Sequence, residues 1–210
     1  MLTELACYNQ DATFQELLET IFISCQKEID SVAIPSGFMN RVNDFLKDQK
    51  FSAAIDFPYG VNGTQVRVHE IILAIRQGAS YIDLVLNSGL IKDKNWHKIK
   101  EDLKACMTVC KTNDVELRVI TEYRLFDTKT LLLLCDLVYG FGVYNMINST
   151  GFIADDLSDN ALISHEIQSK TGMNVTACGR FTSEKHFKMF EDADIYGLRL
   201  MSPRIAEDLL

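Results

Sequence analysis

The amino-acid sequence predicts an α/β protein of the (β/α)8 TIM-barrel class. Eight short apolar runs alternate with eight longer helical patterns, and no Pro-rich or Ser-rich linker interrupts them. Strict alternation implies parallel strands joined by crossover helices, and eight such units favour a closed barrel over an open sheet. Of the 210 residues 47% are apolar, enough for one sizeable core. We expect a single barrel domain over residues 1–210, with an open doubly wound sheet as the alternative.

The apolar runs are the expected strands, and they cover residues 2–7, 31–34, 51–57, 81–86, 115–122, 143–149, 173–177 and 195–200. The helical patterns repeat apolar residues at helical spacing, as Ile71 and Ile75 do. They predict helices over residues 12–26, 37–48, 64–77, 94–111, 129–139, 156–170, 183–191 and 203–210. Gly78, Gly142 and Gly172 stand where helices should end, because glycine readily takes the left-handed conformation found there.

The charge balance bears on the class of partner. A net charge of −8 argues against nucleic acid and against an anionic membrane, which attract basic surfaces. No stretch is long enough to span a bilayer, and the first residues do not resemble a signal peptide. We therefore expect a cytoplasmic protein whose partners are small molecules or proteins, including a homo-oligomer. No Gly-x-Gly-x-x-Gly follows a strand, and no cofactor is expected.

The six cysteines predict reduced thiols packed as small hydrophobic side chains. Cys106 and Cys110 lie four residues apart on an expected helix, which is a possible metal-ligand spacing. No second His or Cys pair has a complementary spacing, so we interpret them as core contacts.

Charged residues stand on or directly after several strands, where a barrel of this class carries its chemistry. They are Glu4, Asp56, Asp83, Arg118 and Glu122. Asp83 lies between apolar neighbours in mid-strand, where an unpaired carboxylate costs several kcal/mol. Asp83 and Arg118 stand on consecutive strands and share the parity of inward-facing residues. We therefore predict that these two side chains pair inside the barrel.

The segment 142–151, with the sequence GVYNMINSTG, combines a strand with a glycine-containing turn. Side-chain alternation puts Asn145, Ile147 and Ser149 on one face of the strand and Met146 on the other. Gly151 allows close approach of a ligand and is expected to open a helix whose free N–H groups suit an anion. The strand itself offers no nucleophile.

The order of four motifs resembles the deoxyribose-phosphate aldolase family, whose members are barrel enzymes that cleave a sugar phosphate through a lysine Schiff base. The motifs are DFPYG at 56–60, GASYIDLVL at 78–86, LRVITE at 117–122 and NSTG at 148–151. The resemblance covers nearly the whole chain. It implies that Asp83 matches the acid that assists proton transfer, and that Gly151 and Gly179 match glycines that contact the substrate phosphate.

The resemblance also implies that three lysines of the family are absent from the positions where the chemistry would occur. The Schiff-base lysine falls on Ile147, a second lysine falls near Val175, and a third is replaced by Arg118. Isoleucine has no amine, and a guanidinium stays protonated, so neither forms a Schiff base. Arg118 is instead suited to neutralise Asp83. The serines after the last strand fall on Arg199 and Leu200.

Two hypotheses remain open. The first is a family member without aldolase activity that still binds a phosphorylated small molecule through Gly151, Gly179, Arg180 and Arg199. Both arginines have an alternative, which is pairing with the many acids of the chain. The second hypothesis is an active lyase that uses a relocated lysine or a divalent metal. The lysines considered are Lys92, Lys94 and Lys185, and the metal would be gathered by Glu4, Asp56, Asp83 and Glu122.

Overall fold

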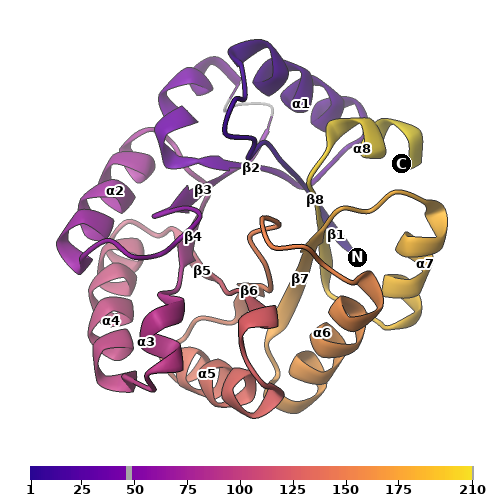
Figure 1. Ribbon diagram of the computed structural model, residues 1–210. Coiled ribbons are helices and arrows are strands. Elements are labelled where there is room, and N and C mark those ends of the chain that lie inside the picture. Colours follow the sequence, from indigo (N-terminus) through magenta and orange to yellow (C-terminus); the bar gives the residue numbers. More distant parts are fainter. Residues whose placement is uncertain (46–48, 210) are drawn as a thin grey trace.

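A computed structural model describes residues 1–45 and 49–209 and confirms the predicted fold class. Within these ranges, eight parallel strands pair in sequence order, and the last strand pairs with the first to close the barrel. Helices surround the strands as an outer ring (Figure 1). The strands are β1 (Leu2–Ala6), β2 (Ser31–Pro35), β3 (Phe51–Ile55), β4 (Tyr81–Val85), β5 (Glu116–Ile120), β6 (Asn145–Ile147), β7 (Asn174–Gly179) and β8 (Gly197–Leu200).

Helices follow the strands at positions close to those predicted. They are α1 (Phe14–Gln26), α2 (Thr64–Arg76), α3 (Ser88–Lys92), α4 (Trp96–Thr112), α5 (Thr128–Gly140), α6 (Leu157–Thr171), α7 (Glu184–Asp192) and α8 (Pro203–Leu209). Gly78, Gly142 and Gly172 all have positive φ, as their placement at helix ends requires. The short helix α3 was not predicted; the Asn87 side chain caps it by accepting from the Leu90 N–H at 3.0 Å.

The prediction of one helix over residues 37–48 is wrong for residues 37–45, which the structure describes. Two short 3-10 helices, η1 (Ser36–Arg41) and η2 (Asn43–Phe45), occupy this segment, and residues 46–48 lie outside the described residues. The stretch contains Gly37, Asn40, Asn43 and Asp44, and all three residue types are poor helix formers. The apolar spacing alone therefore predicted a longer and more regular helix than the segment forms.

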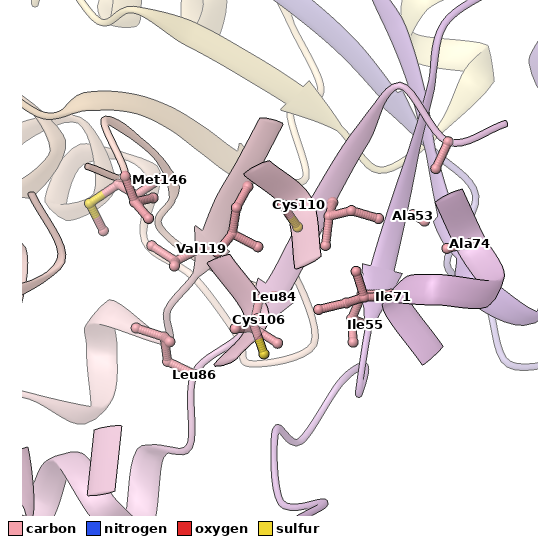
Figure 2. Packing of buried hydrophobic residues seen from close by; sticks show 14 of the residues in the cluster. Ala53, Ile55, Ile71, Ala74, Leu84, Leu86, Cys106, Cys110, Val119 and Met146 are labelled. Atoms are coloured by element: carbon pink, nitrogen blue, oxygen red, sulfur yellow. The ribbon is translucent and has the colours of Figure 1, made fainter. Parts of the chain in front are cut away.

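Most of the apolar core lies between the strands and the helices. In this cluster Ile55, Leu84 and Val119 from the strands pack with residues of α2 and α4 such as Ile71 and Cys106 (Figure 2). Cys106 and Cys110 are both buried, and burial raises the pKa of each thiol to about 12. Both therefore serve as core contacts, in keeping with the sequence interpretation.

Strand β6 has the predicted two faces. Met146 packs outward in the cluster below the helices, whereas Ile147 belongs to a smaller apolar cluster inside the barrel. Asn148 also turns outward, where its amide donates to Asn160 at 2.6 Å and to Ser164 at 2.8 Å on α6. Alternation along the strand thus directs Ile147 inward, to the face on which a barrel enzyme would carry a reactive group.

Arg67 on α2 organises the loop that follows β3. This buried side chain donates to Asp56 at 2.8 Å and to the Val85 carbonyl at 2.8 Å, and it also contacts Asp102 and the Gly60 carbonyl. Gly60 has φ +66°, and a Cβ there would lie 2.8 Å from the Val85 carbonyl oxygen. Close packing of backbone against backbone thus explains the glycine of the DFPYG motif.

No helix within the described ranges combines the length and apolar character that a membrane crossing requires.

Candidate functional site

Four charged side chains form a closed ring in the barrel interior. Asp83 accepts from Arg118 Nε at 2.7 Å and from Arg118 Nη2 at 3.1 Å, which confirms the predicted pair. Arg118 Nη1 also donates to Glu4 at 2.7 Å. Arg199 Nη2 donates to Glu4 at 2.6 Å and to Asp83 at 2.7 Å, which completes the ring. The two carboxylates and two guanidinium groups balance in charge.

Hydroxyl groups satisfy further hydrogen-bonding capacity of the ring. Ser31 donates to Glu4 at 2.6 Å, Ser52 donates to Asp83, and Arg199 donates to the Tyr8 hydroxyl oxygen at 3.0 Å. Glu4, Asp83 and Arg199 have no exposed surface, and Arg118 is 5% exposed. A buried ion pair is tolerated only when such additional hydrogen bonds are present. The hydroxyls of the neighbouring strands therefore belong to the same unit.

The electrostatics hold the ring in its charged form. Burial alone would raise the pKa of Asp83, but Arg118 and Arg199 outweigh it and lower that pKa to about 2. Burial likewise opposes ionisation of Glu4, yet the two arginines bring its pKa below the usual value. Both carboxylates are therefore acceptors only and have no proton to exchange near neutral pH.

An apolar layer separates the ring from the C-terminal mouth of the barrel. Val85 and Ile120 lie two residues beyond Asp83 and Arg118 on their strands, and Ile147 and Cys178 pack in the same cluster. Ile147 is 1% exposed. Ile147 is thus a packing residue of the barrel interior. Above it, the centroids of the Tyr8 and Phe57 rings lie 4.2 Å apart.

Further aromatic and sulfur-containing side chains pack near the mouth. The Phe57 ring packs against that of Phe152 at 5.4 Å. Phe152 belongs to the segment between β6 and α6, which crosses the barrel opening in Figure 1. Met201 also packs against this cluster, and its sulfur lies 3.5 Å from that of Cys178.

The second lysine position needs a correction. Val175 faces outward and packs in the cluster below the helices. The residue in register with Ile147 is its neighbour Thr176, which lines a small pocket of about 50 Å³ together with Ile147 and Arg118. Side-chain alternation makes Thr176 the inward-facing residue. Neither residue supplies an amine.

None of the lysines in the described ranges is buried. Lys92, Lys94 and Lys185, the candidates for a relocated Schiff base, are all exposed. Lys47 lies outside the described residues. A lysine becomes nucleophilic near neutral pH when it is desolvated or placed beside another cation.

The four acids proposed as a metal site do not come together. Asp56 pairs with Arg67, and Glu122 accepts from the Thr150 N–H, whereas Glu4 and Asp83 belong to the interior ring. Among the described residues no three His, Cys, Asp or Glu side chains lie close enough to hold a metal ion. Arginines account for three of the four acids, because Glu4, Asp56 and Asp83 each pair with a guanidinium group rather than with a shared centre.

A pocket of about 360 Å³ lies beside the mouth, between the loops that follow β6 and β7. Its lining includes Gly151, Phe152, Asp155, Gly179 and Arg180. Three residues expected to hold a phosphate therefore come together here. Arg199, expected in the same role, lies instead inside the barrel, where two carboxylates occupy its guanidinium.

The backbone of the NSTG turn differs from the expectation. No helix begins at Gly151, because α6 starts at Leu157 with Asp156 as its cap. The Thr150 N–H donates to Glu122, and the Gly151 N–H donates to the Ser149 hydroxyl at 3.0 Å. Burial raises the pKa of Glu122, although its donors from this turn oppose the shift. The turn therefore satisfies these amides internally.

Sequence reasoning missed two partners of the site. The interior role of Arg199 carried a signal, because its parity on the last strand matches that of Glu4, with which it is in register. The role of Arg67 carried no comparable signal, because its partners are spread over β3, β4 and α4. Contacts of this kind depend on the tertiary fold.

Solved structures with the same fold define the class of protein to which the chain is similar. The aldolase QR15 is 23% identical and superposes with a TM-score of 0.86, covering 98% of this chain and 92% of that structure. A deoxyribose phosphate aldolase from Aeropyrum pernix, described as tetrameric, is 19% identical with a TM-score of 0.88, covering 98% and 88%. These likenesses establish an aldolase-type barrel fold.

Curated relatives identify the family more closely. The deoxyribose-phosphate aldolase of Metamycoplasma hominis is 31% identical over 159 residues, which are 72% of this chain and 72% of that protein. That of Mycoplasmopsis pulmonis is 34% identical over 143 residues, 67% of this chain and 63% of the relative's length. The chain belongs to the deoxyribose-phosphate aldolase family. No family model matches it.

We predict that Arg118→Met lowers the free energy of unfolding by about 3 kcal/mol, because removal of one cation leaves a buried carboxylate unpaired. Urea denaturation monitored by circular dichroism measures this change. Arg76→Met, at an exposed arginine of α2, is the control and should change stability by less than about 0.5 kcal/mol. Equal stability of Arg118→Met and wild type would contradict a buried ring.

The lowered pKa of Asp83 predicts a defined acid sensitivity. Because its pKa in the folded state lies below the unfolded value, its contribution is fully present above about pH 4 and is lost as pH falls towards 2. Wild type should lose on the order of 2 kcal/mol from this group in that window. Asp83→Asn should lack that part of the dependence, whereas the exposed-acid control Asp136→Asn should retain it. Identical pH profiles for wild type and Asp83→Asn would refute the assignment.

Proposed function

We propose that this protein is a member of the aldolase family that does not catalyse Schiff-base aldol cleavage and instead binds a phosphorylated small molecule. The observation that carries the proposal is Ile147. It occupies the inward position of β6 at the family's reactive motif and is packed in an apolar layer. A Schiff base requires an amine at the reacting carbon, and among the described residues the buried cations are all guanidinium groups.

The proposed ligand site is the pocket lined by Gly151, Gly179 and Arg180. Barrel proteins commonly bind phosphate at the loops near the C-terminal ends of the last strands. Arg180 is exposed and, among the described residues, forms no ion pair, so its guanidinium is available for a bidentate contact with phosphate. Asp155 also lines the pocket, but it already accepts from Tyr123 and Asn160.

The competing function is an active lyase that uses a relocated lysine. Lys185 favours this candidate, because it lines a neighbouring pocket together with Arg180. Its side chain is exposed, however, whereas Schiff-base lysines are activated by desolvation or by a neighbouring cation. A cytoplasmic homo-oligomer remains our expectation for the form of the protein.

Borohydride trapping distinguishes the two functions. We predict no covalent adduct by mass spectrometry when the protein is incubated with deoxyribose 5-phosphate and borohydride, whereas an active aldolase of the family should be labelled. We also expect no aldol cleavage above background from Ile147→Lys, because proton transfer still lacks a lysine on β7. A labelled wild-type protein, or turnover by the single variant, would contradict the proposal.

Thermal unfolding with added phosphate ester tests the binding site. Deoxyribose 5-phosphate at a hundred times its dissociation constant should stabilise the protein by about 2.7 kcal/mol. Arg180→Gln should weaken binding and reduce this stabilisation, whereas the control Arg76→Gln should not. An unchanged melting temperature in wild type, or the same shift in Arg180→Gln, would remove the proposed site.

A further inference from the structure

A continuous groove leads away from the proposed phosphate pocket along α6 and α7. The 360 Å³ pocket shares Asp155, Leu157 and Arg180 with a larger pocket of about 760 Å³. The larger pocket in turn shares Met189 and other residues with a third, of about 510 Å³. The space beside Arg180 is therefore much longer than a single phosphate needs.

The end of the groove near the barrel mouth carries available positive charge. Arg180, Lys185 and Lys188 line it, and none of them forms an ion pair within the described part of the chain. Three acids line the same pocket. Two of them are engaged, because Asp155 accepts from Tyr123 and Asn160, and Asp156 caps α6 by accepting from the Ser158 N–H at 2.8 Å.

The remaining acid, Asp192, stands at the boundary with the third pocket. Hydrogen bonds from neutral donors leave Asp156 charged, whereas Asp155 lies 3.8 Å from Arg124 outside the pocket. Three cations thus face two carboxylates that have no cationic partner among the described residues, and the balance favours an anionic group at this end of the groove.

The far end of the groove is apolar. Ala161 and Leu162 of α6 face Met189 of α7 and the following Ala193. Leu162 is 69% exposed. His165 also lines this end, but its Nδ1 is occupied by the Ala193 carbonyl at 2.8 Å. This end can gain free energy by covering apolar surface and offers few unpaired polar groups to a ligand.

The barrel interior above the ring is packed. It is occupied by the apolar layer that contains Ile147, and Phe57, Phe152 and Met201 pack near the mouth. The groove along α6 and α7 is therefore the open space next to Arg180 for the substituent of a bound phosphate.

We propose that the groove binds an amphiphilic phosphate monoester, with the phosphate at Arg180 and an apolar chain lying over Leu162 and Met189. This inference rests on the proposed phosphate site and adds the class of substituent. Leu157 and Leu162 are five residues apart on α6, which corresponds to about 7 Å along the helix axis. An extended chain of about six carbons spans this length.

A series of alkyl phosphates tests the inference. Dissociation constants for inorganic phosphate and for methyl, butyl and hexyl phosphate are measured by isothermal titration calorimetry, at concentrations below micelle formation. Full burial of a methylene corresponds to about a fourfold gain in affinity, and the open groove should give about twofold. Hexyl phosphate should therefore bind about thirtyfold more tightly than methyl phosphate, which has five fewer methylenes.

Two variants separate the two ends of the groove. Leu162→Ser should leave the affinity for methyl phosphate unchanged and reduce the advantage of hexyl phosphate several-fold. Arg180→Gln should weaken all the phosphates by a similar factor. The control Leu73→Ser alters an exposed leucine on α2, which does not line the groove, and should behave as wild type.

The outcomes distinguish this inference from the function on which it rests. If inorganic and alkyl phosphates all fail to bind, both are overturned. If methyl phosphate binds but hexyl phosphate binds no more tightly, the apolar extension is wrong and the phosphate site stands. The extension is also wrong if Leu162→Ser keeps the full chain-length dependence. A fall in oligomeric state of Leu162→Ser, measured by light scattering, would assign the groove to contact between copies and overturn the inference.

Discussion

The ring of Glu4, Asp83, Arg118 and Arg199 is the constraint on which the interior of the barrel depends. Each of these charges would be costly alone in a water-free interior, so each requires the others. The members come from β1, β4, β5 and β8, and the ring therefore joins opposite sides of the barrel. Such a network specifies strand register as well as charge balance, because a slip of one residue would turn a charge outward.

The same ring makes Asp83 ill suited to proton transfer. Asp83 accepts from two guanidinium groups, and its lowered pKa keeps it ionised at neutral pH. A general acid or base works best with a pKa near the operating pH. Arg118 thus determines the protonation state of its neighbour Asp83. Ile147 belongs to the apolar layer above the ring.

Because the interior is packed, the side chains that a ligand can reach lie at the rim of the barrel. The pockets of the C-terminal side lie between the loops after β6 and β7 and between α6 and α7. Their cations are exposed and unpaired within the described residues, in contrast with the fully committed arginines of the interior. One fold therefore holds two sets of arginines with opposite roles: those inside stabilise the barrel, and Arg180 outside remains free to meet a ligand.

The sequence by itself determined the barrel, because strand and helix periodicities are local and repeat eight times. It also determined the pairing of Asp83 with Arg118, since both lie on consecutive strands with matching parity. Only the tertiary structure decided that Arg199 joins them and that Asp56 turns to Arg67, because those choices depend on which cation each carboxylate meets across the fold. The apolar spacing also failed to predict the short 3-10 helices after β2, which only the structure shows. Long-range pairing of buried charge overrides what local pattern can indicate.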